Sequence, residues 1–288
     1  MNWVFYSLIM FIASVGLYLA VRLASIRGVK SSFSNLAMFL VPLCIFLVIA
    51  LKDPSQLHIS TVHLLMIIGI AVFFAFTGNT TSLRAIERAP NPGYSLVLSK
   101  TYVVFTTIVA LTIFGEEFNV RKLIAIGLIV VFAGSIMLSG SSSNENSDKG
   151  DRSWIALSLY SFFAWGMLSL SSKYLFSHGV STMAFLVYLY LIVTLCIGIA
   201  FWRQLKFREL QRSSWMLFLV IGIASAAFNL GQFEAIRLAP NVGYVNAINA
   251  GSIATVTLLA ARLFNDDINR TKLIGVGGVT LGLVLLLI

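Results

Sequence analysis

The sequence predicts an all-α polytopic membrane protein whose ten transmembrane helices form two inverted five-helix repeats. Of its 288 residues, 58% are hydrophobic and only 11% are charged, whereas a soluble domain carries about a quarter charged residues. Apolar runs recur along the whole chain, many of them near the ~20 residues that a helix needs to cross a bilayer. Runs such as IGLIVVFAG (126–134) do not alternate with polar letters, which argues against a membrane barrel.

The apolar runs between polar joints predict ten membrane-spanning helices. The first run lacks the basic flank and small-residue cleavage site of a signal peptide, so we expect it to be retained. In chain order the predicted spans are residues 3–24, 33–51, 62–83, 92–114, 122–139, 153–175, 181–202, 215–234, 242–264 and 272–288.

One long polar stretch, SGSSSNENSDKGDRS, divides the chain near its middle. It is rich in Ser and Asn and has no apolar periodicity, which is typical of a flexible linker. We therefore predict a first five-helix repeat over residues 1–139, a linker over 140–152 and a second repeat over 153–288.

The two halves share a pattern at a fixed offset. AIERAPNPGY (85–94) and AIRLAPNVGY (235–244) agree at seven of ten letters, 150 positions apart. The same shift places Lys122 on Lys272, and a shift of 151 places Gly28 on Gly179. Because each half holds an odd number of spans, the second half must be inverted in the membrane, as in many secondary transporters.

Two further motifs support a family resemblance. AWGMLSLSSK (164–173), followed by AIRLAP (235–240), resembles the EamA-type branch of the drug/metabolite transporter superfamily. The acidic joints followed by KLI resemble it too, in FGEEFNVRKLIAIG (114–127) and FNDDINRTKLIGVG (264–277). The resemblance covers essentially the whole chain, although Val15-Gly16 stands where the second half has Trp165-Gly166. It implies a central cavity between the repeats, lined by the first, third, fourth, sixth, eighth and ninth spans.

Repeat and resemblance together predict a secondary transporter in the cell (inner or plasma) membrane. Its substrate would be a small polar or amphipathic metabolite, amino-acid-like or an organic anion, moved by alternating access. The alternative is a non-transporting membrane scaffold or a lipid-handling accessory protein, which predicts no substrate-dependent flux.

Several classes of function are disfavoured. The net charge of +9 lies in short loops, where membrane topology explains it better than nucleic-acid binding does. We see no nucleophile–base pair, metal-ligand cluster or nucleotide-binding loop, so we expect no enzyme activity, metal or cofactor. The expected partners are the bilayer and a small molecule, with a homodimer left open.

The repeated joint has both a structural and a functional interpretation. Pro90 and Pro240 disfavour the α region for the residue before them, so the third span should end near Ala89. Asn91 and Asn241 can cap the helices that follow. The joint is then either an efficient tight turn or a rigid corner that lets two helices move as one body.

Charged residues precede each joint with the signs exchanged. Arg84 and Glu87 lie three apart, as do Glu234 and Arg237. Residues at this spacing share a helix face. Each pair is predicted to be a local salt pair, with a gate contact as the alternative.

Lys100 is an ionisable residue predicted to lie well inside a span, about 12 Å along the fourth helix from its start. It either attracts an anionic substrate group or snorkels to the interface. Ser95, Ser99, Tyr102 and Thr106 fall on one helical stripe, roughly 130° from Lys100 on the wheel. Either the lysine or this stripe faces the cavity, and the serines could instead form a small-residue packing seam.

Amides and one aromatic side chain complete the predicted site. In an apolar environment amides need partners, either on neighbouring helices or on the substrate, and both interpretations remain. A tryptophan near a pocket could pack in the bundle or line the substrate site. The residues concerned are Asn79, Asn229, Gln232, Asn246, Asn249 and Trp165.

The orientation in the membrane is predicted in two opposite ways. Loops after odd-numbered spans and their flanks hold 14 of the 20 Lys and Arg residues, and the positive-inside rule then places both termini outside. The family resemblance implies that both termini are cytoplasmic.

Overall fold

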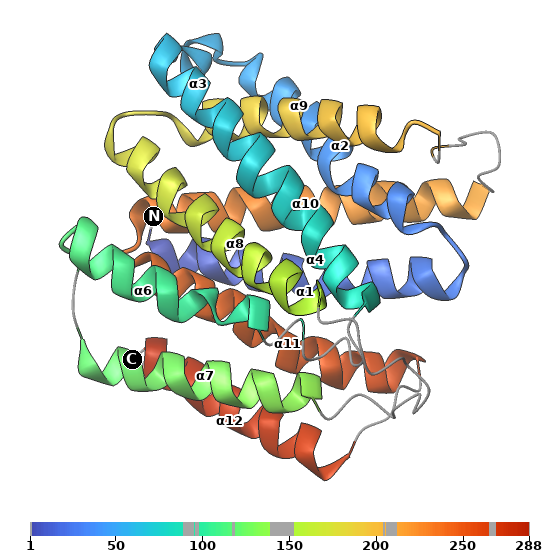
Figure 1. Ribbon diagram of the computed structural model, residues 1–288, viewed down its shortest axis with the longest axis vertical. Coiled ribbons are helices and arrows are strands. Elements are labelled where there is room, and N and C mark those ends of the chain that lie inside the picture. The colour runs from blue at the N-terminus through green and yellow to red at the C-terminus, as the bar shows by residue number, and fades with distance from the viewer. Residues whose placement is uncertain are drawn as a thin grey trace. The chain divides into compact units, whose positions relative to one another are not determined.

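The computed structural model describes residues 2–88, 95, 98–116, 119–138, 153–203, 205, 212–264 and 269–287 (Figure 1). In this part of the chain every regular element is a helix. The elements are α1 (Trp3–Ile26), α2 (Ser31–Ala50), η1 (Pro54–Leu57), α3 (Thr61–Ile70), η2 (Ala71–Phe76), α4 (Thr77–Arg88), α6 (Tyr102–Ile113), α7 (Val120–Leu138), α8 (Ser153–Ser177), α9 (Thr182–Phe201), α10 (Arg212–Leu238), α11 (Val242–Phe264) and α12 (Arg270–Leu287).

The helices are those of a multi-pass membrane protein. Among the described residues, 8 helical segments are long and apolar enough to cross a bilayer. A further apolar helix over Leu98–Ile113 is shorter, and α7 has 19 residues. The predicted all-α membrane class is therefore confirmed, whereas the count of ten spanning helices stays a prediction.

The third predicted span, residues 62–83, differs from a plain α-helix. It begins as α3, continues as the π-helical segment η2 and ends as α4, which is described as far as Arg88. The predicted end near Ala89 lies outside the described residues. The π turn was not predicted, because an unbroken apolar run does not distinguish an α turn from the wider π turn.

Tertiary contacts divide the chain into two compact units that are not its two halves. Unit 1 comprises Met1–Phe76 and Ser171–Leu238, and unit 2 comprises Thr77–Leu170 and Ala239–Ile288. Each unit therefore contains helices from both predicted repeats. The division of the chain into repeats at residues 140–152 concerns sequence duplication and stays a prediction.

In unit 1, α1 packs along α10, and α2 packs against both α10 and α9. At Gly231 of α10 the backbone of α1 comes very close. A Cβ built there would lie 2.9 Å from the amide nitrogen of Met10 and 2.9 Å from the carbonyl oxygen of Tyr6. Small residues at such crossings let two apolar helices gain dispersion energy where lipid offers no hydrophobic driving force.

In unit 2, α7 and α12 lie side by side (Figure 1), and α11 packs against α6, α7 and α12. The face of α12 toward α7 carries glycines. A Cβ on Gly278 would clash with the Phe132 ring, and one on Gly282 would lie 3.0 Å from the carbonyl oxygen of Ala125. The glycines of α12 therefore allow α7 to pack closely against it.

Two pairs of matched positions in the two halves have the same local structure, and the first pair consists of the N-caps Asn119 and Asn269. Asn119 accepts from the Lys122 amide at 3.4 Å, and Asn269 accepts from the Lys272 amide at 2.9 Å. These asparagines begin α7 and α12, which the 150-residue shift pairs. Satisfying the first amides of a helix in this way is the usual role of an N-cap.

Gly28 and Gly179 end α1 and α8 with the same turn. Their φ angles are 72° and 82°, and the amides of Val29 and Val180 each bond a carbonyl five residues back at 2.9 and 3.0 Å. Glycine is favoured at such a C-terminal turn because a Cβ is strained at positive φ.

We expect Gly28→Ala and Gly179→Ala each to lower the free energy of unfolding by about 1 kcal/mol, since both place alanine in the left-handed region. Thermal unfolding in detergent measures the effect. Gly198→Ala is the control, because that helical glycine faces open space. Equal stability of Gly198→Ala and the two turn variants would contradict the prediction.

Candidate functional site

The main polar cluster of unit 2 is centred on Asn246 of α11, which is fully buried. Its Nδ2 donates to Thr106 Oγ1 of α6 at 3.1 Å. Its Oδ1 accepts from Ser169 Oγ of α8 at 3.4 Å. One amide therefore connects three helices, as the inter-helix interpretation of Asn246 predicts, and Thr106 of the predicted stripe is part of this cluster.

Asn249, one turn further along α11, is 5% exposed and differs from Asn246. Its Oδ1 is buried without a hydrogen-bond partner, and Ser252 donates only to its backbone carbonyl at 2.7 Å. An unsatisfied buried acceptor costs about 1–3 kcal/mol. Among the predicted amides in the described part of the chain, Asn249 is the one whose side-chain oxygen is fully buried without a hydrogen-bond partner.

The first turn of α11 is held from three sides. Asn241 caps it, as predicted, by accepting from the Gly243 amide at 2.8 Å. Gly243 itself faces Thr107 of α6, whose Oγ1 would clash with a Cβ built on the glycine. Glu116 accepts from the Val242 amide at 3.0 Å. No larger residue than glycine fits this approach without movement of α6 or α11.

Glu116 and the hydroxyl residues of α8 are site candidates that sequence reasoning missed. Ser158 donates to Ser95 at 2.9 Å, Ser161 and Thr81 share a hydrogen bond at 3.0 Å, and Tyr160 pairs with Thr77 at 2.8 Å. The spacing of Ser158 and Ser161 on α8 was visible, but not which helix they would meet. The contact of Ser95 with α8 supports the packing-seam interpretation of the serines.

In unit 1 the predicted polar residues serve local packing. Asn229 donates to the Ser225 carbonyl of its own helix at 2.8 Å, and Ser225 donates to the Met38 carbonyl of α2 at 2.8 Å. Gln232 is half-buried. Asn229 therefore bonds within α10 and does not bridge to another helix through this amide.

The predicted salt pair of Glu234 and Arg237 is present. Two guanidinium nitrogens of Arg237 contact Glu234 Oε2 at 2.9 and 2.6 Å, with the arginine side chain 43% exposed. Such an exposed pair three residues apart on one helix contributes little stability. A role as a gate contact stays a prediction.

The other predicted residues are placed individually. Tyr102 is buried, Lys100, Asn79, Trp165 and Pro240 are half-buried, and Arg84 is exposed. Pro90 and the side chain of Glu87 lie outside the described residues. Substrate contact by any of these residues stays a prediction.

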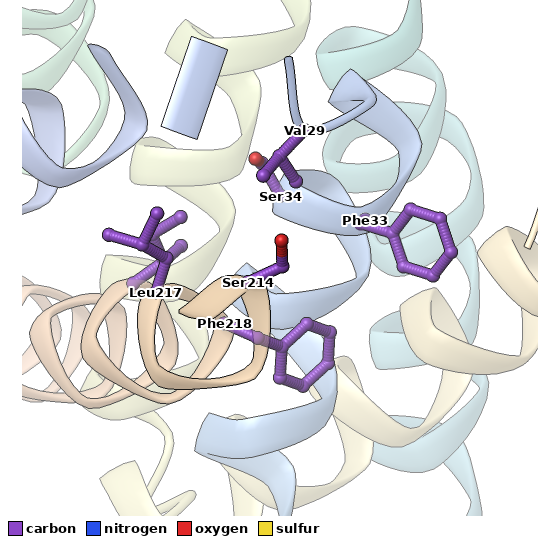
Figure 2. Close-up of a pocket in the computed structure, with 7 residues that line it drawn as sticks. Val29, Phe33, Ser34, Ser214, Leu217 and Phe218 are labelled. Atoms are coloured by element: carbon purple, nitrogen blue, oxygen red, sulfur yellow. The ribbon is translucent and has the colours of Figure 1, made fainter. Parts of the chain in front are cut away.

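A small hollow lies in unit 1, and none of the predicted site residues lines it (Figure 2). It measures about 10 Å³, which is room for about one water molecule. The described residues contain no group of three or more His, Cys, Asp or Glu side chains that could hold a metal ion. The hollow is lined by Val29, Phe33, Ser34, Ser214, Leu217, Phe218 and Ile221.

Comparison with known proteins gives three similarities. Residues 152–288 match the EamA-like transporter family. An "Uncharacterized transporter" of Archaeoglobus fulgidus is 25% identical over 150 residues, which are 52% of this chain and 51% of the relative. The aligned part thus spans about half the length of that curated relative.

A solved crystal structure shares the fold over nearly the whole chain. Its TM-score is 0.77 at 13% sequence identity, with 98% of this chain and 94% of that chain covered. At this identity the likeness concerns the fold alone. The membrane helices indicate a multi-pass membrane protein, part of which is similar to transporters, and none of the comparisons supports the homodimer.

The motif of residues 164–173 and the joint that follows α10 both lie inside the matched half. Residues 152–288 are thus similar to the EamA-like transporter family, which is consistent with the predicted resemblance to the drug/metabolite transporter superfamily.

Proposed function

We propose that this protein is a secondary transporter that moves a small polar or amphipathic metabolite by alternating access between two inverted five-helix repeats. The observation that carries the proposal is the buried Oδ1 of Asn249, which has no hydrogen-bond partner. In an apolar helix such an acceptor is costly unless a ligand satisfies it. The EamA-like domain supports transport independently.

The chemistry of the candidate residues favours an amino-acid-like substrate. An amide oxygen accepts from a substrate ammonium or hydroxyl group. A lysine in a membrane span attracts a carboxylate or phosphate, and such residues often mark substrate pathways. Asn249 and Lys100 together therefore suit a molecule with both a donor and an anionic group.

Purified protein in proteoliposomes tests the proposal with radiolabelled leucine, glutamate and succinate. We expect uptake above that of protein-free liposomes for at least one of the three, driven by its concentration gradient or by exchange. Flux indistinguishable from that of protein-free liposomes for all three would instead favour the scaffold or accessory role.

Lys100→Ala should reduce uptake of the transported probes about tenfold, because leucine, glutamate and succinate all carry a carboxylate and a charged hydrogen bond contributes about 1.5–3 kcal/mol. The matched control is Lys52→Ala, which removes an exposed lysine beyond the end of α2. Uptake of anions that is unchanged in Lys100→Ala would remove this lysine from the substrate site and leave the snorkelling interpretation.

A further inference from the structure

We propose that Glu116 is a positioning residue that fixes α11, and with it the two asparagines of the candidate substrate site. The inference rests on the proposed transport function. Glu116 lies between α6 and α7, in the predicted first repeat, whereas α11 belongs to the second. The two segments meet within unit 2 although 126 residues separate Glu116 from Val242.

The contact places an anion at a helix N-terminus. Glu116 Oε2 accepts from the Val242 amide at 3.0 Å, and the first amides of a helix have no partner within the helix. A carboxylate there also interacts favourably with the helix dipole. Asn241 accepts from the next amide, that of Gly243. Glu116 and Asn241 therefore each satisfy one amide of the first turn of α11.

A second contact from the same segment reinforces the first. The Lys122 ammonium, at the start of α7, lies 4.8 Å from the centroid of the Tyr244 ring, within the range of a cation–π interaction. Glu116 thus contacts the first residue of α11, and Lys122 contacts the third. Two contacts at different positions restrict both translation and rotation of that helix end.

Fixing the first turn of α11 also fixes the positions of Asn246 and Asn249, because both asparagines lie on the same helix. Asn246 and Asn249 follow Val242 by four and seven residues, which is about 6 and 10 Å along the helix axis. Gly243 already lies against Thr107 with no room for a Cβ. A change at the Glu116 contact would therefore alter where both asparagines lie relative to α6.

This contact cannot be repeated by the matched residues of the other half. The 150-residue shift pairs Val242 with Pro92 and Glu116-Glu117 with Asp266-Asp267. Proline has no amide hydrogen to donate. The Glu116 bond is thus specific to α11, the helix with Asn249, whereas the matched position of Asn249 in the first half is Ser99.

Hydrogen–deuterium exchange of the full-length protein in lipid nanodiscs tests this inference. We expect Glu116→Ala to speed exchange of the first two turns of α11 about tenfold, because the charged bond to the Val242 amide is lost. Glu116→Gln keeps an acceptor without the charge and should give a smaller increase. Asp53→Asn, which removes an exposed loop carboxylate, should leave α11 unchanged.

Uptake kinetics separate positioning from simple support of the fold. With the same leucine, glutamate and succinate probes, Glu116→Ala should raise KM several-fold with a smaller change in maximal rate per folded protein, and Glu116→Gln should recover part of the affinity. Unchanged exchange in both Glu116 variants would overturn the inference, as would faster exchange with wild-type KM.

A wild-type protein that moves none of the three probes would count against the proposed function alone. The exchange rates of residues 242–249 would still decide whether Glu116 fixes α11. If Glu116→Ala fails to fold, the isosteric Glu116→Gln carries the same comparison.

Discussion

Gly231→Leu is expected to be among the most destabilising single changes in unit 1. The space where its side chain would begin is filled by main-chain atoms of α1, with the Met10 nitrogen and the Tyr6 oxygen each 2.9 Å from an ideal Cβ. Main-chain atoms of a packed helix cannot rotate away as a flexible side chain can, so α1 and α10 must separate. Overpacking of this kind costs about 1–3 kcal/mol or more.

Thermal unfolding in detergent, followed by tryptophan fluorescence, measures this effect. The matched control is Gly16→Ala on α1, where a Cβ meets nothing within 4 Å. Alanine is favoured over glycine inside a helix by up to about 1 kcal/mol, so the control should be neutral or slightly more stable. A Gly231→Leu protein as stable as the control would show that α1 and α10 do not pack this closely.

The largest effect on transport is expected from Asn249→Leu. The Oδ1 of Asn249 is buried and accepts no hydrogen bond, and leucine fills a similar volume. Removing an unsatisfied acceptor takes away a desolvation cost, so thermal stability should be unchanged or higher. If a substrate donor normally binds there, KM should rise about tenfold or more in proteoliposomes.

Asn246→Leu provides the comparison, because this amide is satisfied by the protein. The variant loses the bonds to Thr106 and Ser169 and leaves their hydroxyls buried on α6 and α8. The free energy of unfolding should fall by about 1–3 kcal/mol. If Asn249→Leu instead lowered thermal stability and left KM unchanged, Asn249 would be removed from the substrate site.

Local features were predicted well because their causes lie within a few residues. The Asn241 cap needs a side chain beside the next amides, and the pair of Glu234 and Arg237 needs only their spacing. Each depends on helix geometry that the sequence pattern already contains.

The partners of the polar side chains could not be predicted in the same way. The bond between Glu116 and Val242 joins residues far apart in the chain. Asn246 differs from Asn249 because it has partners on α6 and α8, whereas the buried Oδ1 of Asn249 has none. Nothing in the sequence distinguished Asn229 from Asn246 as candidate substrate-binding residues, but Asn229 bonds to its own helix. Helical periodicity states which residues share a face and not what that face meets.

By itself the sequence determined that the chain is an all-helical membrane protein. Low charge and long apolar runs leave the backbone no other way to satisfy its hydrogen bonds in lipid. It also determined the Asn241 cap at the start of α11. Only the tertiary structure decided that the compact units combine helices of both halves, and that Glu116 meets α11. In lipid, helices associate through close packing and a few polar contacts, so the choice of neighbour depends on the shapes of surfaces that a one-dimensional pattern does not contain.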